Sequence, residues 1–262
     1  MSLIQAILVG CVAALTQLEG DWLGECKLRE PVITGFLVGL IMGDVTKGLM
    51  IGGALQLMWM GATNIGPSSG LDIGAGGTIG AAVALMTGSD LEVAVAFAIP
   101  VAVIMQMLNI MKMTAFSTLM HQVDAAIDEG NEKKAIFIHY LCGFFTFSIY
   151  FLFTFIVLYF GSNVINSIVE SIPDWAMNGL GAIATVLPAM GFALLLNLLW
   201  DVKLVPYFIV GFVAAAYLGV DMVGVCAIAV AIALIMFEIK SVQLNAVPAA
   251  AIGAEKDEWE DD

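Results

Sequence analysis

One long apolar run, Ala135–Phe160, constrains the fold of this chain more than any other feature. The run is rich in aromatic residues and contains no Asp, Glu, Lys or Arg. A helix needs about 20 consecutive apolar residues to cross a bilayer, so this run can span it with room for tilt. Helices are the expected spanning elements, because lipid offers no hydrogen-bond partner to free backbone groups.

The composition extends this interpretation to the whole chain. Of its 262 residues, 61% are hydrophobic and only 12% are charged, whereas soluble domains carry about 25% charged residues. Such a chain could not hide its apolar surface from water, so we predict an all-α polytopic membrane protein. The net charge of −14 argues against a nucleic-acid partner, because nucleic acids attract basic surfaces.

Three further segments are candidates for the membrane. Leu91–Met111, which contains Pro100, and Leu180–Trp200 are each long enough to span it. Leu204–Phe237 is too long for a single span and is interrupted near its middle. We therefore expect a helical hairpin there that turns near Gly219–Asp221.

The first ninety residues hold shorter apolar pieces, each interrupted by charges or glycines before a full span is complete. These pieces are Ile4–Leu18, Val32–Met42, Leu49–Ala62 and Ile73–Met86. Short, broken hydrophobic segments mark binding regions in transporters, where the freed backbone groups line a cavity. We therefore expect a broken-helix binding region over about residues 20–90, inside a membrane domain of residues 1–240.

Two segments are expected in water. Lys112–Lys134 ends in "DAAIDEGNEKK", and its lysines beside the long apolar run predict a cytoplasmic loop by the positive-inside rule. Residues 241–262 finish with "EKDEWEDD" and are expected to form a disordered acidic tail.

A glycine pattern in the first half of the chain is structural. Gly35, Gly39 and Gly43 recur every four residues and predict a smooth helix face for close packing.

The sequence contains no motif for hydrolysis, nucleotide binding or metal binding. Its four cysteines are far apart and show no ligand or redox spacing. We therefore expect no cofactor and no metal. His121 is expected in solvent and His139 against a helix, although a phosphoryl-carrying role for either histidine stays open.

Polar residues gather in one stretch that has apolar sequence on both sides, "MGATNIGPSSGLDIGAGGTIG" at Met60–Gly80. Polar groups are costly in lipid and should face a cavity or a partner, and the glycines allow the backbone to approach a ligand. Amides and a carboxylate together suit a sugar hydroxyl, which both donates and accepts. The candidates for substrate binding are Gln56, Thr63, Asn64, Ser68, Ser69 and Asp72. Glu25 lies in a mixed-charge segment that is most simply a solvated loop, but it could reach the same cavity.

Several stretches carry a family resemblance: "REPVITGFLVGLIMGDVTKGLMIGGALQLMWMG" followed by "TNIGPSSGLD", then "GLGAIATVLPAMGFALLLNLLW" and "VPYFIVGFVAAAYLGV". They resemble the IIC subunit of the mannose–fructose–sorbose family of the bacterial phosphotransferase system. The last stretch looks most like the N-acetylgalactosamine branch. The resemblance implies a permease subunit, not an enzyme, in the bacterial cell membrane. It would bind a hexose or amino sugar outside and deliver it for phosphorylation by a IIB partner.

The resemblance also implies an architecture and a set of partners. A core helix bundle would face a second domain of broken helices and helical hairpins, with the sugar between them and an elevator-like shift during transport. The expected partners are a IID membrane subunit and cytoplasmic IIA and IIB phosphocarriers, with a trimer of IIC–IID pairs in the lipid bilayer. Because these partners carry the phosphate, the chain needs neither a nucleotide loop nor a catalytic histidine.

Carried over residue by residue, the sugar site of the family falls on the polar stretch. Asn64 matches the family asparagine and Asp72 the family aspartate. Gln56 stands where many relatives have glutamate, and Arg29–Glu30 where many have a histidine–arginine pair, so the local ion pairing is expected to differ.

Two other functions stay open at this point. The intramembrane carboxylates could serve an ion-coupled secondary sugar transporter, since such groups bind protons or sodium in many transporters. The chain could also be a structural scaffold for its partner subunit. The energy source separates a phosphotransferase permease from an ion-coupled transporter, because only the former yields sugar phosphate.

Overall fold

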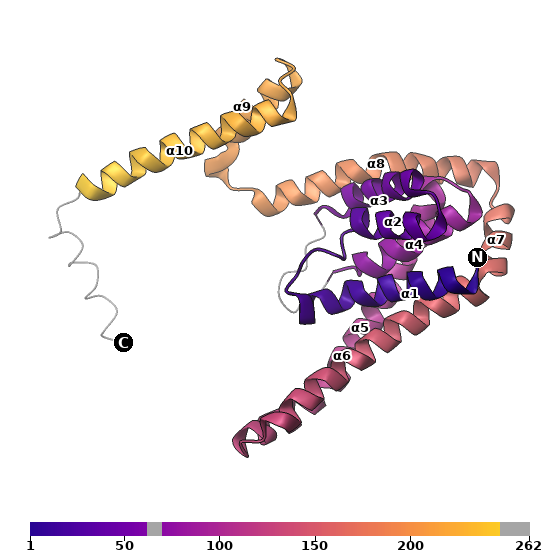
Figure 1. The fold of residues 1–262 in the computed structure, drawn as a ribbon. Coiled ribbons are helices and arrows are strands. Elements are labelled where there is room, and N and C mark those ends of the chain that lie inside the picture. Colours follow the sequence, from indigo (N-terminus) through magenta and orange to yellow (C-terminus); the bar gives the residue numbers. More distant parts are fainter. Residues whose placement is uncertain (62–69, 247–262) are drawn as a thin grey trace. The chain divides into compact units, whose positions relative to one another are not determined.

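The computed structural model describes residues 1–61 and 70–246, and the regular elements in these residues are helices (Figure 1). The chain divides into two compact units, one of residues 1–198 and one that begins at Leu199. Within the described part, five helices are long and apolar enough to cross a membrane. The prediction of an all-α membrane protein is confirmed.

The long helices of the first unit include the predicted spans. They are α1 (Leu3–Leu18), α5 (Leu91–Asp128), α6 (Glu132–Phe155) and α8 (Asp174–Leu199). One π-helical segment, Glu19–Leu23, extends α1, and another, Ile156–Phe160, extends α6 before the short helix α7 (Ser162–Ser171). Three shorter helices lie between α1 and α5: α2 (Pro31–Met42), α3 (Val45–Trp59) and α4 (Ile73–Thr87). At 12 to 15 residues, they fall short of a full span, as the sequence predicts.

The helix α4 forms the core of the first unit. Its residues from Ile73 to Ala84 are all buried, and α1, α2, α3, α5 and α6 pack around it. Glycines permit this close approach: a Cβ built on Gly76 or Gly80 would lie 2.8 or 2.7 Å from an alanine Cβ of α5. These two glycines were expected to let the backbone approach a ligand. The structure corrects that expectation, because they serve helix packing.

Glycines also join α2 to α3. A Cβ on Gly35 would lie 2.5 Å from the carbonyl oxygen of Gly48 and 2.7 Å from the Cα of Gly52. Gly39 packs against the same face, where a Cβ would lie 3.2 Å from the Cα of Gly48. The predicted smooth face is therefore confirmed for Gly35 and Gly39. It is wrong for Gly43, which ends α2 in the left-handed conformation with φ of 90° and has open space around it.

The expected aqueous loop at Lys112–Lys134 is mostly helical. The helix α5 continues to Asp128, and α6 begins at Glu132. The physical reason is that no Pro or Gly lies between Lys112 and Glu129, so nothing ends the helix before Gly130, which has φ of 69°.

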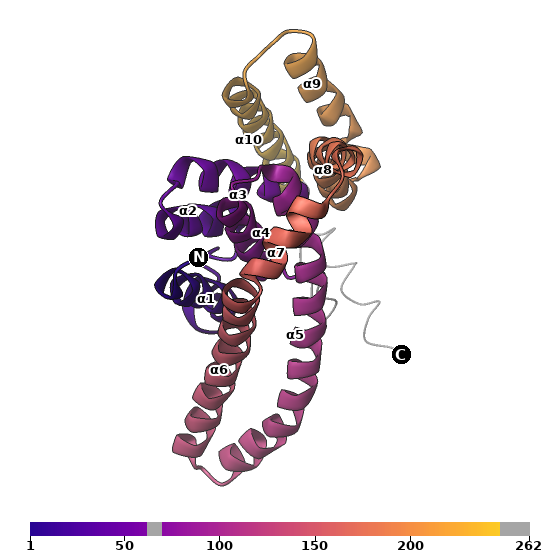
Figure 2. The same cartoon turned by 90° about the vertical axis from the view of Figure 1, so that its right-hand side faces the viewer.

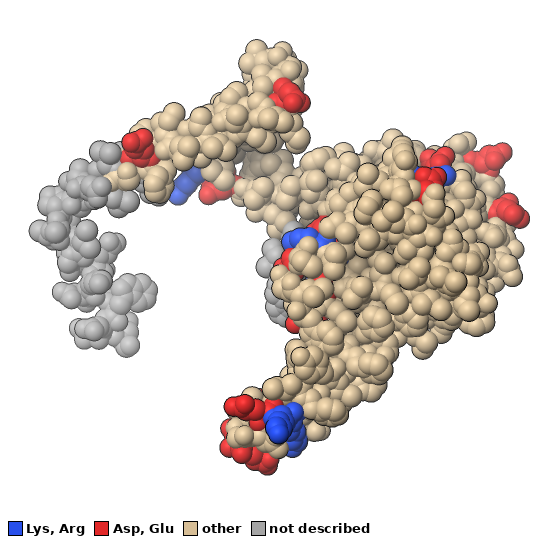
Figure 3. All heavy atoms as spheres, viewed as in Figure 1, with Lys and Arg blue, Asp and Glu red and all other residues tan. Residues whose placement is uncertain are grey.

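The α5–α6 hairpin is longer than a bilayer is thick. With 38 residues, α5 is about 57 Å long, against a hydrocarbon core of about 30 Å. Figures 1 and 2 show the two helices extending side by side from the rest of the first unit. Charged groups of both signs gather at the tip of this hairpin (Figure 3). A polar tip in water agrees with the sequence, and its cytoplasmic side stays a prediction.

The second unit holds a 3₁₀ turn (Val202–Leu204) followed by α9 (Val205–Ala216) and α10 (Met222–Ala246). The chain turns between α9 and α10 at Gly219, which has φ of 63°, so the predicted interruption near Gly219–Asp221 is confirmed. Residues 241–246 of the expected tail are helical. Residues 247–262 lie outside the described residues.

Candidate functional site

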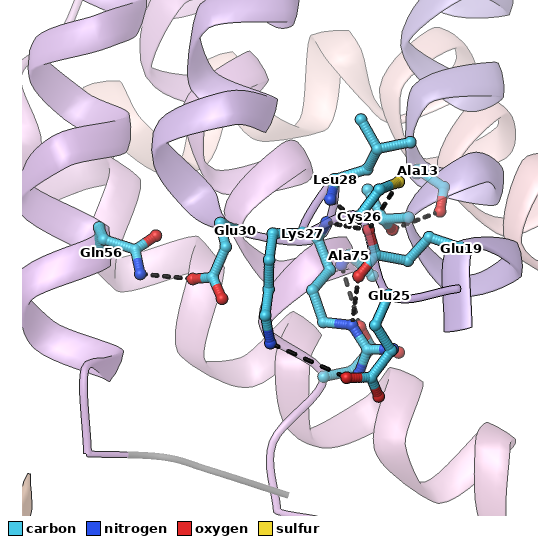
Figure 4. Close-up of polar contacts among 12 residues, drawn as sticks. Ala13, Glu19, Glu25, Cys26, Lys27, Leu28, Glu30, Gln56 and Ala75 are labelled. Carbon is cyan, nitrogen blue, oxygen red and sulfur yellow. Dashed lines mark hydrogen bonds and ion pairs between the residues drawn. The ribbon is translucent and has the colours of Figure 1, made fainter. Parts of the chain in front are cut away.

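A buried carboxylate shapes the loop between α1 and α2. Glu19 is fully buried and accepts hydrogen bonds from the backbone N–H groups of Leu28 and Arg29 (Figure 4). It also accepts one from Nε of Arg29 at 2.9 Å. Glu25 and Lys27 in this loop have φ of 54° and 67°, a conformation that non-glycine residues keep only where their surroundings impose it. The Glu19 contacts therefore fix the path of the loop into α2.

That path ends at Glu30, the residue before α2, which meets Gln56 on α3. Nε2 of Gln56 donates a hydrogen bond to the Glu30 carboxylate (Figure 4). The other side-chain atom, Oε1 of Gln56, is buried and accepts no hydrogen bond from the described residues. Within those residues Glu30 forms no ion pair. The pair therefore holds unused acceptors, which suit a ligand that donates hydrogen bonds.

Asp72 lies at the start of α4 and is 7% exposed. One oxygen of its carboxylate accepts a hydrogen bond from the Ala75 N–H at 3.0 Å, which caps α4, and the other accepts one from the Tyr150 hydroxyl on α6. The backbone N–H of Asp72 donates to the Ala102 carbonyl on α5 at 3.3 Å. Asp72 thus ties the beginning of α4 to two long helices, α5 and α6.

Three polar residues, Gln106, Asn109 and Lys112, follow one face of α5, and we call them the α5 stripe. Their exposed fractions are only 6 to 8%. Nε2 of Gln17 on α1 lies 3.5 Å from Oδ1 of Asn109, at the limit of a hydrogen bond. The sequence analysis does not identify this stripe, because it predicts an apolar span over 91–111 and a loop that begins at Lys112. The three-residue spacing was the signal that could have found it.

The structure separates the predicted site residues. Asp72 is buried and Gln56 is partly buried, and the two belong to different groups of contacts within the first unit. Four other candidates lie outside the described residues: Thr63, Asn64, Ser68 and Ser69. The Glu25 side chain is 66% exposed and lies 4.0 Å from Nζ of Lys27. Reasoning from the sequence did not identify Glu19, Glu30 or Lys112 as site residues.

A comparison with protein families decides the class of this chain. The family described as the sorbose-specific IIC component of the phosphotransferase system matches residues 3–235. The chain belongs to this family. It is a IIC permease component, a transport subunit of the bacterial membrane in a system whose IIB partner performs the phosphorylation. The resemblance stated from its sequence is confirmed.

Known relatives of this IIC subunit cover most of its length. The mannose-specific EIIC component of Escherichia coli strain K12 is 27% identical over 256 residues, which is 97% of this chain and 95% of the relative. The N-acetylgalactosamine permease IIC component 1 of the same strain is 28% identical over 200 residues, or 76% and 75% of the two chains.

Two solved structures resemble this IIC subunit. One, described as a membrane protein, is 28% identical and has a TM-score of 0.85. The match covers 94% of this chain and 100% of that one. The other, the mannose transporter ManYZ in complex with microcin E492, is 28% identical with a TM-score of 0.58, and the match covers 91% of this chain and 96% of that one. The second supports association of IIC with IID within the family.

Proposed function

We propose that this IIC subunit binds a hexose or amino sugar at the outer face of the membrane and delivers it inside for phosphorylation by IIB. Relatives named for mannose and N-acetylgalactosamine are 27% and 28% identical to it. Because these values are alike, the N-acetylgalactosamine branch stays a prediction. The sugar class, its binding site and the full set of partners belong to the proposal.

The observation that carries the proposed site is the unused acceptor of Gln56. A buried polar atom without a partner costs about 1–3 kcal/mol, so a ligand hydroxyl that donates to it recovers this free energy. The Glu30 carboxylate beside it adds a charged acceptor. A sugar offers several donating hydroxyls within a few ångströms, which matches two adjacent acceptors, one just before α2 and one on α3.

The segment after α3 completes the proposed site. Thr63, Asn64, Ser68 and Ser69 follow the end of α3 closely in sequence, and Asn64 matches the family asparagine. Asp72 stays within the proposal, and its described contacts hold it at the start of α4. Glu25 is a weaker member, because its side chain is exposed and faces Lys27.

We also propose the assembly that the resemblance implies. The subunit would pair with IID in the membrane, as a trimer of IIC–IID pairs, and cytoplasmic IIA and IIB would carry the phosphoryl group to the delivered sugar. Much of the apolar surface of unit 1 is exposed, including Phe137, Phe144 and Phe145 on α6. Such a surface is stable only in contact with lipid or another membrane protein.

The site is tested by sugar uptake into vesicles that hold all partners. The variants Gln56→Ala and Glu30→Gln should each raise KM about tenfold, because a hydrogen bond to a charged or buried group contributes about 1.5 kcal/mol. Glu132→Gln, which changes an exposed carboxylate at the start of α6 outside the proposed site, is the matched control and should keep the wild-type KM. Wild-type KM in both Gln56→Ala and Glu30→Gln, at equal expression, would refute the site.

A further inference from the structure

A buried lysine in α5 has no conventional partner. Lys112 is 7% exposed, and within the described part of the chain its ammonium forms no hydrogen bond and no ion pair. A charged side chain in a membrane helix is costly and normally pairs with an opposite charge or faces a cavity. The chain keeps such a charge although Met or Leu would fill the same space, so its compensating partner has to be identified.

The aromatic ring of Tyr150 connects Lys112 to a carboxylate. Nζ of Lys112 lies 5.7 Å from the centre of the Tyr150 ring and 5.9 Å from that of Phe116. A cation near the face of an aromatic ring is attracted by its quadrupole, and more strongly when both are desolvated. The hydroxyl of the same Tyr150 donates to Asp72. A cation, an aromatic ring and an anion therefore form one continuous series from α5 through α6 to α4.

The other charges nearby are engaged elsewhere. Arg29 and Lys112 both attract Asp72 electrostatically, but Nε of Arg29 is bonded to Glu19. Asp21, the other carboxylate that acts on Lys112, is exposed to solvent. Arg29 is thus already neutralised by Glu19, whereas Lys112 has no ion pair with a carboxylate among the described residues.

We propose that Lys112 is the intramembrane counter-charge of Asp72, and that it acts through Tyr150 as a positioning residue for Asp72 and the start of α4. This inference rests on the proposed function, because Asp72 is one of the proposed sugar ligands. The Asp72 carboxylate accepts the Tyr150 and Ala75 hydrogen bonds, and Lys112 on the other side of the Tyr150 ring is placed to offset its charge. Without the cation, the Asp72 carboxylate that caps α4 and bonds Tyr150 on α6 would be buried with no counter-charge beside the Tyr150 ring.

A double-mutant cycle tests the pair without reference to sugar. The thermal stability of the purified IIC–IID complex is measured for Lys112→Met, Asp72→Asn and the combined variant. Each single variant leaves one buried charge uncompensated, whereas the combined variant leaves none, so its loss should be smaller than the sum of the two. Lys133→Met, an exposed lysine at the tip of the same hairpin, is the control and should behave like wild type. Strictly additive losses would refute the pairing.

Sugar uptake tests the positioning role separately. Lys112→Met should raise KM about tenfold with a smaller change in the maximal rate, and Lys112→Arg, which keeps the charge, should restore most of the affinity. Non-additive stability together with an unchanged KM in Lys112→Met would overturn the positioning role. Absence of sugar uptake by the wild-type complex would contradict the proposed function instead, and leave the stability cycle as an independent result.

Discussion

Glu19 is the residue that the loop before α2 depends on most. Its carboxylate is fully buried and accepts from two backbone N–H groups and from the Arg29 side chain. Removing the charge of Glu19 should cost more stability than removing one partner of an exposed ion pair. The backbone donors and the Arg29 guanidinium would be left without their acceptor. The strained residues Glu25 and Lys27 then lose the contacts that hold their conformation.

We therefore expect Glu19→Gln to destabilise the protein by about 3 kcal/mol. The new amide would present N–H to the N–H donors of Leu28 and Arg29, and Arg29 would lose its counter-charge. Thermal unfolding in detergent measures the loss, and Glu25→Gln at an exposed position is the control. Equal unfolding temperatures for the two variants would contradict the role assigned to Glu19.

The sequence shows only part of this chemistry at the residue scale. Gln56 could be predicted because an amide inside an apolar run is costly in lipid and should therefore face a cavity or a partner. Glu19 could not, because "EGDWLGECKLRE" contains several charges of both signs and is typical of a solvated loop. Which carboxylate of such a segment is buried depends on tertiary packing. Lys112 was missed for the same reason, since its burial depends on Tyr150, far away in the chain.

At the scale of elements, adjacent glycines on α3 have opposite surroundings. A Cβ on Gly52 would overlap the Pro31 carbonyl oxygen and lie 3.1 Å from the Cα of Gly35 on α2. A Cβ on Gly53 would meet nothing within 4 Å. Both residues lie inside the same helix, so they share the intrinsic preference of a helix for alanine over glycine.

This contrast predicts that alanine substitutions at these two neighbouring glycines change the stability of the protein in different directions. Gly52→Ala should destabilise the protein by about 1–3 kcal/mol, because backbone atoms cannot yield to an added methyl group. Gly53→Ala should leave stability unchanged or raise it by about 1 kcal/mol, because alanine is the better helix former. Thermal unfolding of both variants checks the α2–α3 packing, and a loss of the same size in both would refute it.

The pattern of elements was partly predictable for physical reasons. The short helices of the first ninety residues were predicted because charges and glycines interrupt their apolar runs, and Gly43 and Gly88 do end α2 and α4. The continuation of α5 was not found, because hydropathy falls at Lys112 while helix propensity does not. The central place of α4 depends on glycines whose role becomes visible only when neighbouring helices surround them.

At the scale of the whole molecule, the described polar chemistry of the first unit is suited to binding. Gln56 with Glu30 holds unused acceptors, and Asp72, Tyr150 and Lys112 anchor the helix that follows the polar segment. A permease subunit whose partners carry the phosphate needs to recognise and move a sugar, and it needs nothing further from its own side chains. We therefore predict that transport depends on the phosphoryl donor of the system.

The most direct test of this account is the chemical form of the sugar that arrives inside. Sealed vesicles would hold this IIC chain with IID in the membrane and, inside, IIA, IIB and the phosphocarriers that pass phosphoryl groups from phosphoenolpyruvate to IIA. A labelled sugar would be supplied on the outer side. We predict that label accumulates as sugar phosphate, only when phosphoenolpyruvate is supplied, and that an uncoupler leaves it unchanged. Accumulation of free sugar that collapses with an uncoupler would contradict the account and support an ion-coupled transporter.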